Sequence, residues 1–209
     1  MKINEIFYSI QGEGSTMGSP TIFIRTTGCN LRCTYCDTTY AYEQGKEMSI
    51  EQILEQIELY TCDQICITGG EPLLQKEIND LIDELVQLKK TIILETNGSQ
   101  SIQECINYDS MIISMDLKTP SSQMNEHMHL KNFTSLRSQD QLKCIINDKK
   151  DYQYAKSIIK KYQPNCRIFF QPVWGTDTSK LASWLLEDQL SVRLGIQLHK
   201  IIWGENTRC

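Results

Sequence analysis

Three cysteines lie close together near the N-terminus, at Cys29, Cys33 and Cys36. Their C-x3-C-x2-C spacing can place three thiolates on one small inorganic cluster, and thiolates select iron–sulfur, zinc or copper centres. A 4Fe-4S cube has four irons, so three protein ligands leave one iron free for a small molecule. A structural zinc ion needs a fourth ligand, but the next cysteine is Cys62 and the first histidine is His127. Three buried structural thiols are a weaker alternative, because the cysteines fall within eight residues.

This spacing is the signature of radical S-adenosylmethionine (SAM) enzymes, which the chain resembles. In such enzymes the free iron binds the amino and carboxylate groups of SAM, and the cleaved cofactor yields a radical that removes hydrogen from the substrate. The GGEP sequence at residues 69–72 follows an apolar strand and matches the superfamily element that contacts the methionine amino group of SAM. Alone, GGEP is a common turn. Combined with the three cysteines, it favours a cofactor site.

The composition excludes several classes of function. The 209 residues, of which 40% are hydrophobic, fit one domain with a sizeable core. The net charge of -5 argues against nucleic-acid binding through a basic surface. No apolar run approaches the ~18 residues that a membrane span requires, and there is no signal-peptide pattern. The odd number of nine cysteines fits a reducing compartment. We therefore expect a cytoplasmic protein with no nucleic-acid or membrane partner.

Apolar strand patterns alternate with helical patterns along the chain. Strands are expected at 21–25, 64–68, 92–95, 111–115, 141–146, 167–171 and 192–197, after an opening segment at 5–10. Helices are expected after a cap at Ser49, then at 78–88, from about 101, and at 152–162 and 179–187. Repeated strand–helix alternation predicts an α/β fold in which outer helices surround a parallel sheet or barrel.

Unusual residues fall at the C-terminal ends of these expected strands, where parallel α/β barrels carry their chemistry. They are Arg25, Gly69 to Glu71, Thr96 to Gly98, Asp116 with Lys118, and Gln171 with Pro172. This placement supports the barrel. We expect a single domain over residues 1–209, with the cluster loop at 26–48. The polar stretch 119–137 could form a lid, a partly ordered loop or short helices over one mouth of the barrel.

Motifs along essentially the whole chain narrow the family. They are FYSIQGEG (7–14), FIRTTGCNL (23–31), CDT (36–38), GGEP (69–72), ETNG (95–98) and LHK (198–200). Together they resemble the 7-carboxy-7-deazaguanine synthases. Members of that family look like a partial, TIM-like radical SAM barrel. They convert 6-carboxy-5,6,7,8-tetrahydropterin to 7-carboxy-7-deazaguanine with loss of ammonia, on the route to deazapurines such as queuosine or archaeosine.

The resemblance implies a substrate site. The matching positions are Ile10, Gln11, Gly12, Glu13, Arg25, Thr96, His199 and Cys209. Glu13, Arg25 and His199 are the candidate catalytic residues. A carboxylate such as Glu13 suits the donors of a pterin edge, and Arg25 can pair with the substrate carboxylate. For Arg25 the alternative is a weak surface salt bridge. At Cys209 the sequence departs from the small or apolar endings of the family.

The resemblance also implies metal and cofactor contacts. Cys29, Cys33 and Cys36 would hold a 4Fe-4S cluster, and the Thr38 oxygen would bind Mg²⁺, which bridges to substrate oxygens. The positions that match SAM contacts are Tyr35, Cys36, Asp37, Gly69, Gly70, Glu71, Gly98, Ser114, Lys118 and Gln171. The stretch 114–118 is longer than the compact Ser-Pro-Lys of several members, which leaves the contacts near the SAM ribose open. An electron donor such as flavodoxin or ferredoxin and a homodimer complete the expected partners.

Two other functions remain open on the sequence. A radical SAM activase, which makes a glycyl radical on a partner protein, would use the same cysteines but would not need Gln11, Glu13, Arg25 or Thr38. An interaction module that holds zinc or an iron–sulfur centre without turnover is the second, and a colourless zinc protein would support it. An auxiliary cluster at Cys62 and Cys66 has too few ligands. We therefore interpret these two as structural thiols, together with Cys105, Cys144 and Cys166.

Overall fold

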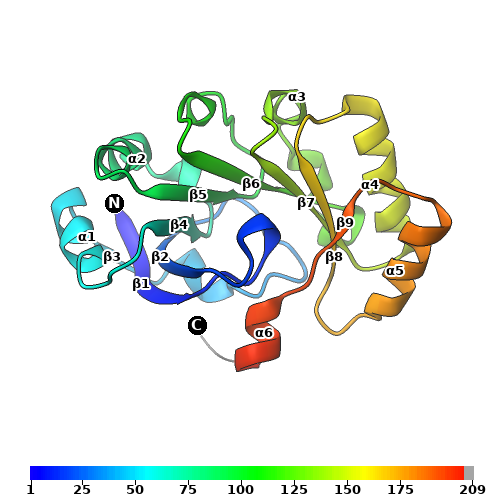
Figure 1. Cartoon of the computed structure of the whole chain (residues 1–209), viewed down its shortest axis with the longest axis horizontal. Helices are drawn as coiled ribbons and strands as arrows, with labels where there is room; N and C mark the ends of the chain where they lie inside the picture. Colours follow the sequence, from blue (N-terminus) through cyan, green and yellow to red (C-terminus); the bar gives the residue numbers. More distant parts are fainter. Residues whose placement is uncertain (205–209) are drawn as a thin grey trace.

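The computed structural model describes residues 1–204, which form one curved sheet with helices along its outer side (Figure 1). Within these residues nine strands follow the order β3-β1-β2-β4-β5-β6-β7-β8-β9. Each neighbouring pair from β2 to β9 is parallel, whereas β1 is antiparallel to both β2 and β3. The predicted α/β class is confirmed, and the open, mostly parallel sheet is consistent with a partial TIM-like barrel.

The strands and helices are close to those expected. The strands are β1 (Lys2–Ile10), β2 (Pro20–Thr26), β3 (Lys46–Glu47), β4 (Gln64–Gly69), β5 (Thr91–Thr96), β6 (Met111–Leu117), β7 (Gln141–Ile146), β8 (Arg167–Pro172) and β9 (Arg193–Leu194). The α-helices are α1 (Ile50–Ile57), α2 (Ile78–Gln87), α3 (Asn132–Ser135), α4 (Lys149–Tyr162), α5 (Thr178–Glu187) and α6 (Leu198–Trp203). At the start of α1, Ser49 and Gln52 form the reciprocal side-chain to backbone pair of a capping box.

Two expectations differ from the structure. The strand expected at 192–197 is only the two-residue β9, because the chain turns away after Gly195, whose N–H donates to the Phe170 carbonyl at 2.8 Å. The helix expected from about residue 101 is a single 3-10 turn at Cys105–Asn107. Short segments such as these have little periodicity from which to predict their extent.

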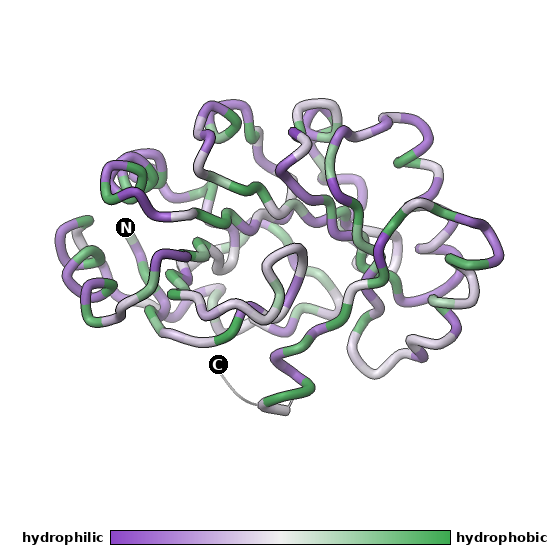
Figure 2. Tube along the Cα trace, in the orientation of Figure 1, coloured by the Kyte–Doolittle hydropathy of each residue, from purple (hydrophilic) through white to green (hydrophobic). Residues whose placement is uncertain are grey.

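The sheet buries both of its faces. On β4, Ile65 and Ile67 point to the outer helices and join the main core. Cys66 points the other way and packs with Phe23 and Ile93 in a smaller cluster inside the curve. The outer helices alternate hydrophilic and hydrophobic residues along the trace (Figure 2), as expected for helices with one buried face. The parallel strands therefore form a rigid base whose C-terminal ends can carry functional side chains.

The polar stretch 119–137 forms short helices, one of the three alternatives open on the sequence. These are 3-10 turns at Pro120–Ser122 and Asn125–His127, followed by α3. Thr34 of the cluster loop donates from Oγ1 to the Ser121 carbonyl at 2.6 Å, and His129 N–H donates to the Gly98 carbonyl at 2.9 Å. The stretch therefore packs against the cluster loop and the segment after β5. No helix within residues 1–204 has the length and apolar composition to span a bilayer.

Candidate active site

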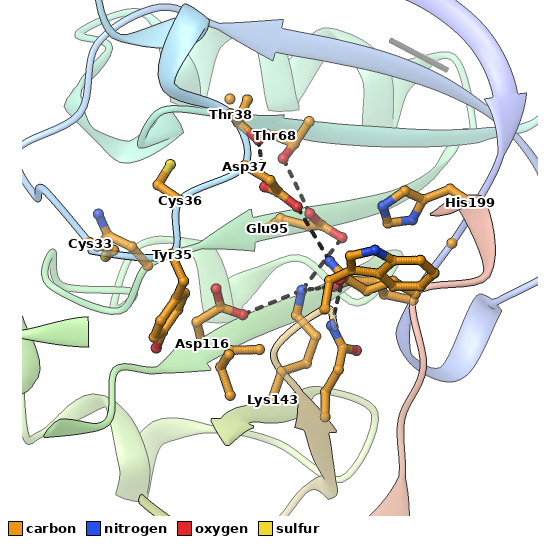
Figure 3. Close-up of a pocket in the computed structure, with 18 of the residues that line it drawn as sticks. Cys33, Tyr35, Cys36, Asp37, Thr38, Thr68, Glu95, Asp116, Lys143 and His199 are labelled. Carbon is orange, nitrogen blue, oxygen red and sulfur yellow. Dashed lines mark hydrogen bonds and ion pairs between the residues drawn. The ribbon is translucent and has the colours of Figure 1, made fainter. Parts of the chain in front are cut away.

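A cavity of about 710 Å³ lies at the C-terminal ends of the parallel strands, bounded by the cluster loop and α6. Figure 3 shows Cys33 and Cys36 on one side and His199 on the other, with Lys143 and Asp116 between them. The predicted site residues that line the cavity are Ile10, Gln11, Gly12, Glu13, Arg25, Cys29, Cys33, Tyr35, Cys36, Asp37, Thr38, Gly69, Gly70, Thr96, Lys118, Gln171 and His199. The fold thus gathers residues from distant parts of the chain into one chamber.

Lys143 lies at the centre of a charged network in this cavity. Its ammonium nitrogen is 2.7 Å from Glu13 Oε2, 3.3 Å from Asp116 Oδ1 and 3.9 Å from Glu95 Oε1. The side chain is 5% exposed, so little water screens these pairs. Burial lowers the pKa of Lys143, but the charges of Asp116, Glu13 and Glu95 outweigh burial and raise it well above its usual value. Lys143 is therefore a fixed positive charge.

Glu13 accepts hydrogen bonds from three side chains. Lys143 reaches Oε2, while Gln171 Nε2 at 2.8 Å and Gln197 Nε2 at 3.0 Å reach Oε1. Burial raises the pKa of Glu13, but the charge and hydrogen bond of Lys143 outweigh burial and lower it. Glu13 is therefore ionised, and one carboxylate joins the loop after β1 to β7, β8 and the start of α6.

The loop at residues 11–14 needs its first glycine to make room for His199. A Cβ atom at Gly12 would lie 2.0 Å from His199 Nδ1, which is far inside contact distance. The Gly12 carbonyl also accepts from Leu198 N–H at 2.9 Å. Burial lowers the pKa of His199, although the charges of Glu13 and Asp37 oppose that shift. A neutral imidazole is thus held against the loop at the edge of the cavity.

Helix α6 is tied to the cluster loop by an ion pair. Lys200 Nζ is 2.7 Å from Asp37 Oδ2, and Gln197 Nε2 is 3.4 Å from the same oxygen. Burial raises the pKa of Asp37, but the hydrogen bond and charge of Lys200 outweigh burial and lower it to about 2. Thr38 donates from Oγ1 to Asp37 Oδ1 at 3.0 Å. Asp37 and Thr38, the predicted site residues next to Cys36, are thus linked to α6.

Arg25 is not the weak surface pair that the sequence left open. Its Nε lies 2.7 Å from Glu5 Oε1, and the two side chains are only 14% and 21% exposed. The guanidinium carbon lies 5.5 Å from the ring centre of Phe7 and 5.8 Å from that of Tyr40. A planar cation between two aromatic rings has little freedom to turn. Arg25 is held in one orientation where it lines the cavity.

Glu71 of the GGEP element does not line the cavity, which corrects the expected direct contact with SAM. Its side chain is fully buried and accepts from Thr96 Oγ1 at 2.8 Å, from Asn97 N–H at 2.7 Å and from Leu73 N–H at 3.1 Å. Burial raises the pKa of Glu71 to about 7, although these hydrogen bonds oppose that shift. The carboxyl group instead holds the end of β5 in place.

The two glycines before Glu71 serve close packing against the cluster loop. A Cβ atom at Gly70 would lie 2.0 Å from the Gly28 carbonyl oxygen. Glu71 N–H donates to that same oxygen at 2.7 Å, and Gly70 N–H donates to the Thr26 carbonyl at 3.2 Å. The GGEP element thus fixes the point at which the cluster loop leaves β2.

Two further predicted residues, Ser114 and Gly98, do not line the cavity. Ser114 is fully buried behind its wall, where Gln141 Nε2 donates to its hydroxyl at 2.8 Å. Gly98 packs against the 119–137 stretch, because a Cβ atom there would lie 2.6 Å from Met128. Other parts of the chain thus fill the space beside these two residues. Cys209 lies outside the described residues.

The cavity contains charged residues that the sequence did not single out. Lys143 and Glu95 line it but were assigned no role, and Gln197 joins the Glu13 network. Lys143 interrupts the otherwise apolar end of β7, and a lysine inside a buried parallel strand is itself a signal. Glu95 opens the ETNG motif at the C-terminal end of β5. Gln197 carries no comparable signal.

The fold and the cysteine-lined cavity define a radical SAM enzyme. The model of the Radical SAM superfamily matches residues 23–163, and the chain belongs to this superfamily. A relative from Thermoplasma acidophilum is 38% identical over 205 residues, 98% of both chains, and one from Methanospirillum hungatei is 41% identical over 97% of this chain and 85% of its own. Both are named 7-carboxy-7-deazaguanine synthase, and the chain belongs to that family.

A solved structure supports the same fold. The crystal structure of QueE from Escherichia coli superposes with a TM-score of 0.79 over 95% of this chain and 94% of its own, at 23% identity. Membership of an enzyme family decides against an interaction module without turnover and against an activase. Radical SAM enzymes use a 4Fe-4S cluster and SAM, so this chain uses both.

The cavity residues fit these cofactors. The three cysteines are partly exposed and line the cavity. Within residues 1–204 no group of three His, Cys, Asp or Glu side chains converges on one metal ion. Gln171 Oε1 is buried in the wall without a hydrogen-bond partner among the described residues, and a bound cofactor can supply the missing donor.

Proposed function

We propose that this chain converts 6-carboxy-5,6,7,8-tetrahydropterin to 7-carboxy-7-deazaguanine with loss of ammonia, in deazapurine biosynthesis. The names of its relatives support the reaction. One observation carries the proposal. A single cavity unites three thiols on one side with Glu13, Arg25 and His199 elsewhere in the wall. An activase would have no use for the second group.

The cluster and SAM, when bound, supply an organic radical that removes hydrogen from the substrate. The chain holds the cluster through Cys29, Cys33 and Cys36. Tyr35, Asp37, Gly69, Gly70, Lys118 and Gln171 line the same cavity and would form the SAM site. Lys118 is held at 2.8 Å from Asp116 Oδ2, which keeps its ammonium group beside the cofactor.

The substrate lies between Arg25 and Glu13. Arg25 is fixed between Phe7 and Tyr40, so its outer nitrogens can pair with the substrate carboxylate without losing much freedom. Glu13 receives the N–H donors of the pterin edge. A carboxylate has about four acceptor sites, and Glu13 already accepts from three side chains. Gln197, the most distant of the three donors, gives way when the pterin binds.

Other residues complete the substrate site. Ile10, Gln11, Gly12 and Thr96 line the wall between these two ends. Neutral His199 accepts or donates one hydrogen bond at the edge of the pterin. Thr38 Oγ1 supplies one hard oxygen to Mg²⁺, and substrate oxygens and water supply the others. The exposure of Thr38 in the cavity wall supports this role.

The partners and location belong to the same proposal. A flavodoxin or ferredoxin supplies the electron, as a reduced cluster requires a donor of low potential. Exposed Ile201, Ile202 and Trp203 on α6 support an interface between two copies in a homodimer. Three cluster-ligating thiols support a reducing compartment, and hence the cytoplasm. Light scattering on the reconstituted protein tests the dimer, since a monomer mass would contradict it.

The test of the reaction is anaerobic reconstitution. The protein with cluster, SAM, Mg²⁺ and dithionite is mixed with the carboxytetrahydropterin, and mass spectrometry looks for 7-carboxy-7-deazaguanine. We expect product with the native chain and none with Cys33→Ala. Cys62→Ala is the matched control, because Cys62 lies outside the cavity and its thiol donates to the carbonyls of Pro20 and Gln64. Formation of 5'-deoxyadenosine without the deazaguanine would contradict the assigned substrate.

A further inference from the structure

The cluster loop and the segment after β5 are joined by polar contacts next to one cysteine. The Asn97 side-chain nitrogen Nδ2 lies 3.6 Å from Cys29 Sγ and 3.2 Å from Asn30 Oδ1. The backbone N–H of Leu31 points at the same sulfur from 3.4 Å. Cys29 therefore receives two N–H donors, and one of them comes from a different strand end.

The orientation of the Asn97 amide is fixed by its other contacts. Ser99 N–H donates to Asn97 Oδ1 at 2.9 Å, so the oxygen end faces Ser99 and the NH₂ end faces the sulfur. The backbone N–H of Asn97 donates to buried Glu71 at 2.7 Å. Only 7% of the residue is exposed. The donor is thus held in one orientation at the cavity wall.

A donor aimed at a cluster thiolate changes the energy of the reduced state. Reduction adds one negative charge to the cluster, and that charge spreads partly onto the cysteine sulfurs. An N–H dipole pointing at a sulfur stabilises the more negative form more strongly, so it raises the reduction potential. The effect is stronger where little water screens it, and only 7% of Asn97 is exposed.

We propose that Asn97 tunes the reduction potential of the cluster by donating a hydrogen bond to Cys29. Asn97 is then a positioning and tuning residue, and Glu71 and Ser99 act through it. This role explains why Glu71 is buried beneath the segment after β5 and does not face the cofactor. The inference rests on cluster binding by the chain but is independent of the substrate.

The test is the midpoint potential of the reconstituted cluster, measured by dithionite titration with electron paramagnetic resonance detection. SAM and pterin are absent, so an error in the assigned substrate cannot affect the result. Asn97→Leu keeps the side-chain size and removes the donor. We expect the same iron and sulfide content as in the native chain and a shift of the potential to more negative values.

Two further variants make the outcome decisive. Ser99→Ala removes the Ser99 hydroxyl contacts with Asn30 and leaves the Asn97 amide in place, so its potential should match that of the native chain. Asn97→Asp keeps the acceptor for Ser99 N–H but turns an oxygen towards the sulfur, so its potential should fall further than that of Asn97→Leu. An unchanged potential in Asn97→Leu overturns the proposal. So does loss of the cluster in both Asn97 variants with normal loading in Ser99→Ala, because that result assigns Asn97 a structural role alone.

Discussion

Two neighbouring levels of side chains inside the curved sheet differ in kind although they stand on the same strands. The apolar layer consists of Phe23 on β2, Cys66 on β4 and Ile93 on β5. The polar layer consists of Arg25, Thr68 and Glu95, each two residues further along the same strand. Because side chains alternate along a strand, both layers face the inside. The side chains that face the inside thus change from apolar to polar over two residues of each strand.

The two layers are stabilised in different ways. The apolar side chains need no specific partner, and burial of each stabilises the fold by about 1.5–3 kcal/mol. The polar layer contains charges away from water, which are tolerated only when paired. Arg25 pairs with Glu5, and Glu95 accepts from Thr68 Oγ1 at 3.2 Å and faces Lys143. The apolar layer thus stabilises the fold, and the polar layer can contact the ligands in the cavity.

The strongest way to break the polar layer is Lys143→Met. The change removes the cation from Glu13 and Glu95 and leaves Asp116 with Lys118 alone, so the pKa of Glu13 should rise and the substrate edge should lose its acceptor. We expect a loss of turnover of about 100-fold or more, and a loss of stability of about 3–5 kcal/mol from the broken buried pairs. Lys150→Met on exposed α4 is the control, with both quantities close to native. Native turnover in Lys143→Met would show that the network is not needed.

Ile93→Ala tests the apolar layer, where we expect a loss of stability without a loss of turnover. Ile93 is 1% exposed and lies among Phe23 and Cys66. Its truncation leaves a cavity that should cost about 2–5 kcal/mol in the free energy of unfolding. Chemical denaturation measures this loss. Turnover below the unfolding transition should stay near native, and a selective loss of turnover would mean that this layer also positions the ligands.

Gly12→Ala tests whether the position of His199 affects binding of the pterin separately from binding of the cluster. The added methyl group must displace the His199 ring, which should raise KM for the pterin about 10-fold and leave cluster content unchanged. Gly18→Ala is the comparison, because an added Cβ there meets no atom within 4 Å although its backbone φ of +91° is strained. That variant should lose about 1 kcal/mol of stability with native KM. Equal KM values in the two variants would contradict the placement of His199.

Glu71→Gln leaves both layers in place and tests the pH dependence of stability. The folded pKa of Glu71 is raised from 4.5 to about 7, so the folded chain binds a proton that the unfolded chain releases between these values. Its contribution to stability is fully present below pH 4.5 and is lost as pH rises to 7, with a slope of at most about 1.4 kcal/mol per pH unit. Glu71→Gln should flatten that slope in urea titrations from pH 5 to 7. An identical slope in both chains would mean that Glu71 is ionised throughout.

The sequence predicts the strands with strong apolar patterns and the residues whose motif is local. The predicted bounds of β7, 141–146, are those of the structure. The spacing of the three cysteines is enough to predict a cluster site. Lys143 shows why other parts could not be predicted. Its partner Glu13 lies 130 positions away in the loop after β1, and only the tertiary fold brings the two side chains together. Glu71 shows the converse, because its motif suggests a ligand contact while the packing of β4 against β5 turns its side chain into the core.

An open sheet leaves a gap between its first and last strands, and here side chains and one backbone hydrogen bond, from Leu198 N–H to the Gly12 carbonyl, close it. Helix α6 follows β9 at one edge of the sheet, and the ion pair between Lys200 and Asp37 joins it to the loop after β2. The Asp37 side chain is 48% exposed, so dissolved salt weakens this ion pair. These contacts lie outside the strand pairing, so their loss would leave every strand paired and the walls of the cavity folded.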